Sequence, residues 1–137
     1  MIIFDIDCFK QYNDNYGHID GDSCLISISK ELSKSLVKDY FAARYGGDEF
    51  VIILPDTDID QAKEYGENLR HNVERLALTH KFSKVKDIVT VTLGVSSVIP
   101  NSDISITEFI KQADTALYEA KKTGRNRTIS FIGNKKL

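Results

Sequence analysis

The sequence has 137 residues, of which 42% are hydrophobic and 28% charged, values that fit one folded domain and argue against a disordered chain. The longest apolar run, residues 50–54, is far shorter than the ~20 residues of a membrane helix, and Asp5 and Asp7 exclude a signal peptide. We therefore expect one cytoplasmic domain over residues 1–137, with no membrane segment in the chain.

The charges and the cysteines exclude further classes of function. A net charge of −2 gives no reason to expect a nucleic-acid partner. Residues 1–60 carry 5 basic and 12 acidic side chains, and residues 61–137 carry 13 basic and 8 acidic ones. This asymmetry reflects either uneven surface charge or a cation site in one half and a phosphate site in the other. Cys8, Cys24 and the three histidines lack zinc-ligand spacing, so we expect free thiols and no zinc.

The first half of the chain begins with a predicted buried strand at residues 2–6. The polar residues 8–20 predict a short helix and a loop, and apolar residues at helical spacing predict a helix over 22–37. Two strand-like runs, 40–45 and 49–54, flank Gly46-Gly47. This pattern is typical of a hairpin, because its turn needs positive φ angles.

The second half is predicted to contain two capped helices and two strands. Asp58 and Gln61 have the spacing of a capping box, as do Ser105 and Glu108 before the last helix, which we expect to end near Gly124. Apolar residues alternate with polar ones over 89–96, which predicts a half-buried strand, and the last strand is expected at 128–132.

The predicted order is therefore β-α-β-β-α-β with a further helix and strand appended. It indicates an α+β fold of the ferredoxin-like type. Because the first two strands run parallel, Asp5 and Asp48 are expected at the same edge of the sheet. Two carboxylates there would suit Mg²⁺, but acidic residues at strand ends are more often solvated turn residues.

Lys121 and Arg125 are four residues apart near the end of the last helix, so we expect both side chains on one face. They either clamp a triphosphate or act as favourable cations at a helix C-terminus. The residues alone leave both interpretations open.

The segment Arg44-Tyr45-Gly46-Gly47-Asp48-Glu49-Phe50 resembles the GGDEF signature of diguanylate cyclases, whose domain has a nucleotide-cyclase, polymerase-palm-like fold. Residues 4–22 are similar to the first-strand and substrate-loop motif of that family, 89–96 to its central strand and 113–126 to its last helix. These motifs occur in the order and spacing of the family, from about residue 2 to 132. The chain is therefore identified as a member.

This resemblance implies that the protein condenses two GTP into cyclic di-GMP and releases pyrophosphate, with Mg²⁺ or Mn²⁺, as a homodimer of half-sites. Asp5, Asp48 and the Ile6 carbonyl match the metal ligands. Glu49 matches the second acid of the signature, which orients metal-bound water or helps to deprotonate the attacking 3′-hydroxyl. The positions that match the phosphate contacts are Phe9, Lys10, Gly46, Gly47, Lys121 and Arg125.

Asn13 and Asp22 match the residues that read guanine. Guanine presents N1–H and N2–H₂ donors that a carboxylate accepts, whereas adenine has an unprotonated N1 that a carboxylate repels. Asp22 is therefore expected to favour GTP over ATP.

The chain departs from the family pattern at two places. The family usually has a helix before the first strand, so we expect the N-terminus to be truncated and any sensory domain to lie upstream. Val37-Lys38-Asp39-Tyr40 replaces the family's inhibitory Arg-x-x-Asp, so we expect no inhibitory product site. The alternative functions are a catalytically weak or inactive module that binds GTP or a dinucleotide, and a structural interaction domain.

Overall fold

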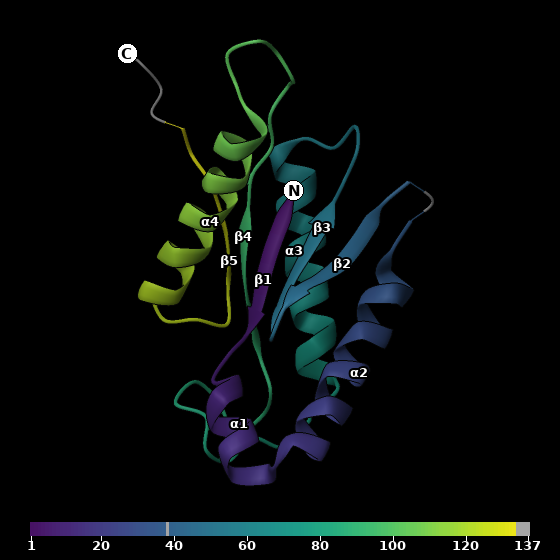
Figure 1. Cartoon of the computed structure of the whole chain (residues 1–137), viewed down its shortest axis with the longest axis vertical. Helices are drawn as coiled ribbons and strands as arrows, with labels where there is room; N and C mark the ends of the chain where they lie inside the picture. The colour runs from purple at the N-terminus through teal and green to yellow at the C-terminus, as the bar shows by residue number, and fades with distance from the viewer. Residues whose placement is uncertain (38, 134–137) are drawn as a thin grey trace.

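The computed structural model describes residues 1–37 and 39–133. A five-stranded sheet with the order β2-β3-β1-β4-β5 forms its centre (Figure 1). None of the helices in the described residues is long and apolar enough to cross a membrane. The elements in chain order are β1 (Ile2–Ile6), α1 (Phe9–Tyr16), α2 (His18–Ser35), β2 (Phe41–Gly46), β3 (Glu49–Ile53), α3 (Ile59–Arg75), β4 (Val91–Val95), α4 (Ile106–Lys122) and β5 (Thr128–Ser130).

The central strand β1 pairs antiparallel with both β3 and β4, and β2 pairs antiparallel with β3. β1 and β2 therefore run in the same direction, as predicted, and the βαββαβ order with an appended α4 and β5 is confirmed. In the register, Asp5 lies opposite Glu49. The end of β1 thus adjoins the β2–β3 turn, as expected.

The two faces of the sheet are covered by different helices (Figure 1). Ile2, Phe4 and Ile6 of β1 belong to the larger core, together with apolar residues of α2 and α3. Ile3 packs with Ala113 and Leu117 of α4 on the other face. Because side chains alternate along a strand, Asp5 also lies on the α4 face.

Strand β4 is fully buried, so the prediction of a half-buried strand over 89–96 is wrong. The polar residues Thr90, Thr92 and Ser96 are buried as well, because helix α4 covers the second face of the strand. A Cβ at Gly94 would lie 2.3 Å from the backbone of α4 at Ala113 and Leu117. Glycine is therefore what lets this helix pack directly on the strand.

Helix α2 begins at His18, four residues before the predicted start, and the predicted loop before it is reduced to Gly17.

The hairpin turn also differs from the prediction, because Gly46 still belongs to β2 and Gly47 alone of the two glycines has a positive φ, of 50°. Asp48 therefore lies within the turn itself. Both bonds of the predicted capping box are present at Asp58 and Gln61.

At the second predicted capping box, the Ser105 side chain accepts a hydrogen bond from the Glu108 N–H. Cys8 and Cys24 are free thiols, as predicted. Burial raises the pKa of the Cys24 thiol to about 11.

Candidate active site

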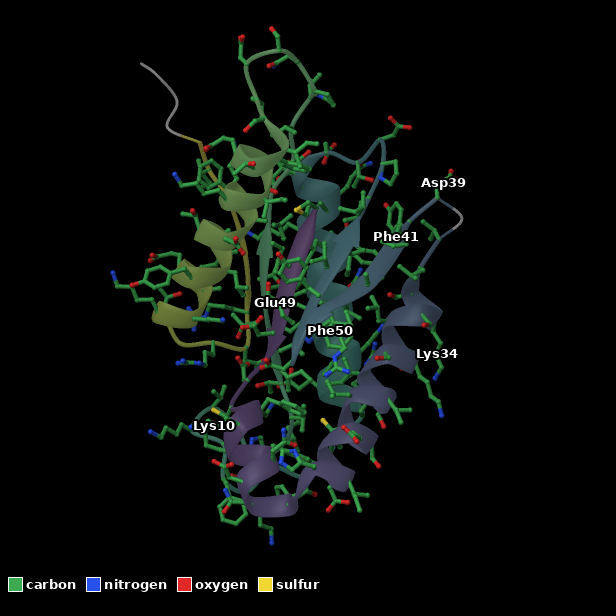
Figure 2. The ribbon with its side chains drawn as sticks, in the orientation of Figure 1. Lys10, Lys34, Asp39, Phe41, Glu49 and Phe50 are labelled. Carbon is green, nitrogen blue, oxygen red and sulfur yellow. The ribbon has the colours of Figure 1, made fainter. Side chains whose placement is uncertain are left out.

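Three carboxylates that we call the acidic edge, Asp5, Asp48 and Glu49, gather where β1 meets the β2–β3 turn. Asp5 and Glu49 lie opposite each other in the register, and the Ile6 N–H donates to the Asp48 carbonyl at 3.3 Å. Figure 2 shows Glu49 and Phe50 in the part of the sheet nearest to α1. Asp5 and Asp48, which are 43 positions apart in the sequence, are thus brought to the same edge of the sheet.

Lys121 of α4 forms an ion pair with Asp5 across this edge. The Asp5 side chain is only 14% exposed, and its other oxygen, Oδ1, is buried without a hydrogen-bond partner in the described residues. Its charge is balanced by the ammonium group of Lys121, a side chain that is 36% exposed.

The pKa values of two of these acids are raised. Burial raises the pKa of Asp48, the charges of Asp5 and Asp7 add to this, and a backbone hydrogen bond and Lys121 oppose it. Burial also raises the pKa of Glu49, with further contributions from Asp5 and Asp114. Clustered acids disfavour one another's ionised form, so this edge is a place where added positive charge is stabilised.

A pocket of about 370 Å³, the α1–α2 pocket, adjoins the acidic edge and shares Asp48 with it. It brings together Asp48, predicted as a metal ligand, and five of the residues predicted to contact the nucleotide, namely Phe9, Lys10, Asn13, Asp22 and Gly47. Asp14, His18, Leu25 and Arg44 complete its lining. Lys10 is exposed and extends from the first turn of α1 away from the ribbon (Figure 2).

The α1–α2 pocket contains a polar atom that has no partner. The side-chain oxygen Oδ1 of Asn13 is buried and unpartnered in the described part of the chain. It lies directly against Gly21, where a Cβ would come within 1.8 Å of it. Gly21 thus makes room for the Asn13 amide, and a buried polar group without a partner is a candidate to meet a ligand.

Gly46 and Gly47 border open space, since a Cβ on either would meet nothing within 4 Å. The Gly47 carbonyl accepts from Arg44 Nε at 2.7 Å, which ties the turn back to β2. The hairpin therefore presents bare backbone beside Asp48, where a bulky ligand can approach closely.

Arg125 does not lie on α4, so the prediction that it shares a helical face with Lys121 is wrong. The helix ends at Lys122, and Gly124 follows with a φ of 129°. The Arg125 N–H then donates to the Ala120 carbonyl at 3.0 Å, the bond that closes a Schellman motif. Arg125 is exposed in the turn between α4 and β5, and its Nη1 donates to the Lys121 carbonyl at 3.5 Å.

Two residues without a predicted role hold this region together. Asp7 is buried and accepts from Thr90 Oγ1 at 2.8 Å and from Thr92 Oγ1 at 2.6 Å. His80 is fully buried, and its Nε2–H donates to the carbonyl of Cys8 at 2.9 Å, which fixes the left-handed Cys8 ahead of α1. Spacing gave no signal for His80, because its partner lies 72 residues away.

A larger cavity of about 890 Å³ lies at the other end of the sheet, lined mainly by apolar residues near Met1, Leu54 and Phe109. It contains none of the predicted site residues, so we place the candidate site at the acidic edge. The predicted absence of an inhibitory site over residues 37–40 stays a prediction, because Lys38 lies outside the described residues.

The donor set of the acidic edge fits a hard divalent cation. Within the part of the chain that the structure describes, Asp5 Oδ1 is a buried oxygen without a partner, and Lys121 already holds a positive charge at the other oxygen. In residues 1–37 and 39–133, no group of three or more His, Cys, Asp or Glu side chains could hold a metal ion. Mg²⁺ is often held by one or two carboxylates together with substrate phosphates, so two carboxylates suffice.

Comparisons with known proteins agree with this geometry. The sequence profile of the family described as "Diguanylate cyclase, GGDEF domain" matches residues 1–127. The chain is 39% identical over 129 residues to the probable diguanylate cyclase DgcT of Escherichia coli, covering 94% of this chain and 28% of that protein. It is 40% identical over 131 residues to the diguanylate cyclase VdcA of Vibrio cholerae, covering 94% of this chain and 38% of that protein.

A solved structure with the same fold is the GGDEF domain of DgcB from Caulobacter crescentus in complex with c-di-GMP. The TM-score is 0.83 at 33% sequence identity, over 94% of this chain and 75% of that chain. The chain spans about a third of the length of the two curated relatives named above.

Proposed function

Because the chain belongs to the family of GGDEF domains of diguanylate cyclases, we propose that it condenses two GTP molecules into cyclic di-GMP and releases two pyrophosphates. The observation that carries this proposal is the convergence of Asp5, Asp48 and Lys121 beside the α1–α2 pocket. The groups proposed to bind the charged tail of a nucleotide adjoin the pocket lined by Asn13, whose amide oxygen has no partner in the described residues.

The acidic edge is proposed to act on the phosphates. A bound Mg²⁺, or Mn²⁺ in its place, would be held by Asp5, Asp48 and the Ile6 carbonyl and would supply positive charge to the phosphate oxygens. Lys121 lies on the Asp5 carboxylate and is within reach of the same oxygens. Lys10, Arg125 and the bare backbone at Gly46 and Gly47 are proposed to complete the triphosphate site.

Each turnover forms two phosphodiester bonds. The 3′-oxygen of one GTP bonds to the α-phosphorus of the other, and the bond from that phosphorus to the bridging oxygen breaks, so that pyrophosphate leaves. Glu49 is proposed to take the hydroxyl proton, and its raised pKa supports this role because a base works best when its pKa approaches the working pH.

Asn13 and Asp22 are proposed to read guanine. Both line the α1–α2 pocket, on α1 and α2. The Asp22 carboxylate would accept from N1–H and N2–H₂ of guanine, and Asn13 would contact the base through the amide that Gly21 leaves room for. Since one copy of the chain offers one such pocket, ring closure is proposed to need a second copy, with the two half-sites facing each other.

The test is incubation with GTP and Mg²⁺ over a range of protein concentrations, with the products separated by chromatography. We expect cyclic di-GMP, at a rate that rises faster than linearly with protein concentration, and none from Asp48→Ala. GTP binding without product would contradict catalysis and favour a binding module. Product from Asp48→Ala would contradict the proposed site.

A further inference from the structure

The turn between α4 and β5 has an unusual backbone. Arg125 and Asn126 are consecutive non-glycine residues in the left-handed region, with φ angles of 60° and 46°. Such conformations persist only where the surroundings hold them, and they cluster at functional sites. The turn therefore needs an anchor outside its own sequence.

Asn126 is the residue through which the turn is anchored, because three other elements bind it. Its backbone N–H donates to Thr92 Oγ1 at 2.9 Å and lies 3.2 Å from Asp7 Oδ2. Its side-chain Oδ1 accepts from Arg70 Nη1 at 2.9 Å, and its Nδ2 donates to Glu74 Oε1 at 3.3 Å. Strand β4, the end of β1 and helix α3 thus all hold one residue.

Arg70 is the buried basic residue of this network. It is 8% exposed, and its guanidinium also binds Glu67 at 3.0 Å through Nε and Glu74 at 3.2 Å through Nη1. A planar guanidinium with carboxylate partners on both sides has little freedom to rotate. It lies 56 residues from Asn126 in the sequence and on a different helix from the phosphate-binding residues.

We propose that Arg70 is a positioning residue for triphosphate binding. It holds the Asn126 side chain, and through Asn126 it holds the left-handed turn from which Arg125 projects. Asp7 ties the same turn to β1, two residues beyond Asp5. The network thereby holds Arg125 in a fixed position relative to the acidic edge. Neither Arg70 nor Asn126 is itself assigned to the substrate. The inference rests on the proposed function, because it concerns how the phosphates of GTP are held.

The test compares two ligands and a double-mutant cycle on the 137-residue chain. The ligands are guanosine and a GTP analogue with a methylene bridge between the α- and β-phosphates, which binds without reacting. Arg70→Lys keeps the charge but loses the fork of donors to Glu67 and Asn126. We expect it to weaken binding of the analogue about tenfold, as for a lost charge-assisted contact, and to leave guanosine binding unchanged.

The cycle uses Arg125→Ala as the second substitution. If Arg70 acts through Arg125, then Arg70→Lys has no further effect on analogue binding in the Arg125→Ala background. Equal weakening of guanosine and analogue binding would overturn the proposal, as would a full additional loss in that background. A general loss of packing would produce these two results.

A second variant and the binding of the analogue to the wild-type chain complete the test. If Arg70→Lys does not fold, Asn126→Gly takes its place. It removes the bonds between Asn126 and Arg70, and glycine accepts the left-handed backbone, so we expect the same loss of analogue binding with guanosine binding unchanged. The analogue reports binding alone. If the wild-type chain binds it but forms no product from GTP, the proposed catalysis is contradicted, and the double-mutant cycle still decides the positioning role of Arg70. A wild-type chain that does not bind the analogue overturns both.

Discussion

The α1–α2 pocket and the acidic edge meet at Asp48, but different interactions hold them in place. Most of the pocket lining comes from the continuous stretch of residues 9–25, with Arg44, Gly47 and Asp48 added by the hairpin. The stretch is shaped by close packing, as in the contact between Gly21 and the Asn13 amide. The acidic edge combines carboxylates from the first strand and the hairpin, and an ion pair links Asp5 to Lys121 at the end of α4. The pocket is thus sensitive to shape, and the acidic edge is sensitive to charge.

The largest effect is expected from removing one charge at the acidic edge. Asp5→Asn keeps the size of the side chain but removes the negative charge that faces Lys121 and the proposed cation. We expect cyclic di-GMP formation to fall by about 10³-fold or more, because electrostatic stabilisation is the main contribution to catalysis at such sites. Product formation by chromatography measures it, and far-ultraviolet circular dichroism checks the fold.

Asp103→Asn is the matched control, since Asp103 is exposed in the loop before α4 and belongs to neither part of the site. It should leave the rate unchanged. Activity of Asp5→Asn within tenfold of wild type would show that this carboxylate is not part of the catalytic centre.

The pocket should respond to a change of shape that leaves every charge in place. In Gly21→Ala the new methyl group occupies the position of Asn13 Oδ1, so the Asn13 side chain must move. We expect KM for GTP to rise about tenfold with little change in kcat, the cost of one lost hydrogen bond to the base.

Asn13→Ala provides the comparison for this effect. It should raise KM by a similar factor, and adding Gly21→Ala to it should have little further effect, because the displaced amide is already gone. A fall in kcat at unchanged KM would show that Gly21 serves the acidic edge instead.

A smaller effect is expected from substituting Lys121, which should raise the affinity for Mn²⁺ and lower the affinity for the GTP analogue. In the structure its ammonium neutralises Asp5, so it competes with any metal ion for that carboxylate. Lys121→Met should increase the affinity for Mn²⁺ without nucleotide by about threefold to fivefold, since removing a nearby cation favours another one there. The same variant should weaken binding of the unreactive GTP analogue.

Electron paramagnetic resonance of free Mn²⁺ measures this affinity. Lys122→Met is the control, because Lys122 is the exposed neighbour on the same helix and makes no contact with Asp5 in the structure. If both variants change Mn²⁺ binding equally, the effect reflects net charge and not the ion pair with Asp5.

The sequence predicts the pocket better than it predicts the phosphate-binding turn. The family resemblance assigned Asn13 and Asp22 to one guanine site, and the structure places both in the lining of the α1–α2 pocket. Arg125 was predicted on the same helical face as Lys121, yet the helix ends at Lys122, and Gly124 then turns the backbone. Periodicity cannot detect such a Schellman motif, since it depends on a single left-handed residue.

Long-range anchors were also beyond the reach of sequence patterns. The roles of Asp7, Arg70 and His80 depend on partners 56 to 119 residues away in the chain. The burial of Thr90 and Thr92 likewise results from contacts made by α4 and Asp7, so an alternating pattern was misread as a half-exposed strand. Tertiary contacts, which no local pattern encodes, decided these points.

The smallest predicted effect concerns the acid stability of the network behind the phosphate-binding turn. The hydrogen bond from Lys86 lowers the pKa of Glu74 below its ordinary value of 4.5, and Asn126 and Arg70 contribute in the same direction. A carboxyl whose pKa is lower in the folded state stabilises that state above the unfolded pKa. This stabilisation is lost as the pH falls through the folded-state pKa.

Glu74→Gln should therefore lower the free energy of unfolding near neutral pH, by about 1 kcal/mol or less, and should flatten its decline below pH 4.5. Urea unfolding over a pH series measures both quantities, and Glu64→Gln, exposed on the same helix, is the control. If Glu74→Gln leaves the slope unchanged, the ion pairs of Glu74 contribute nothing to acid stability. The left-handed turn would then depend on the remaining bonds of Asn126, to Arg70, Asp7 and Thr92.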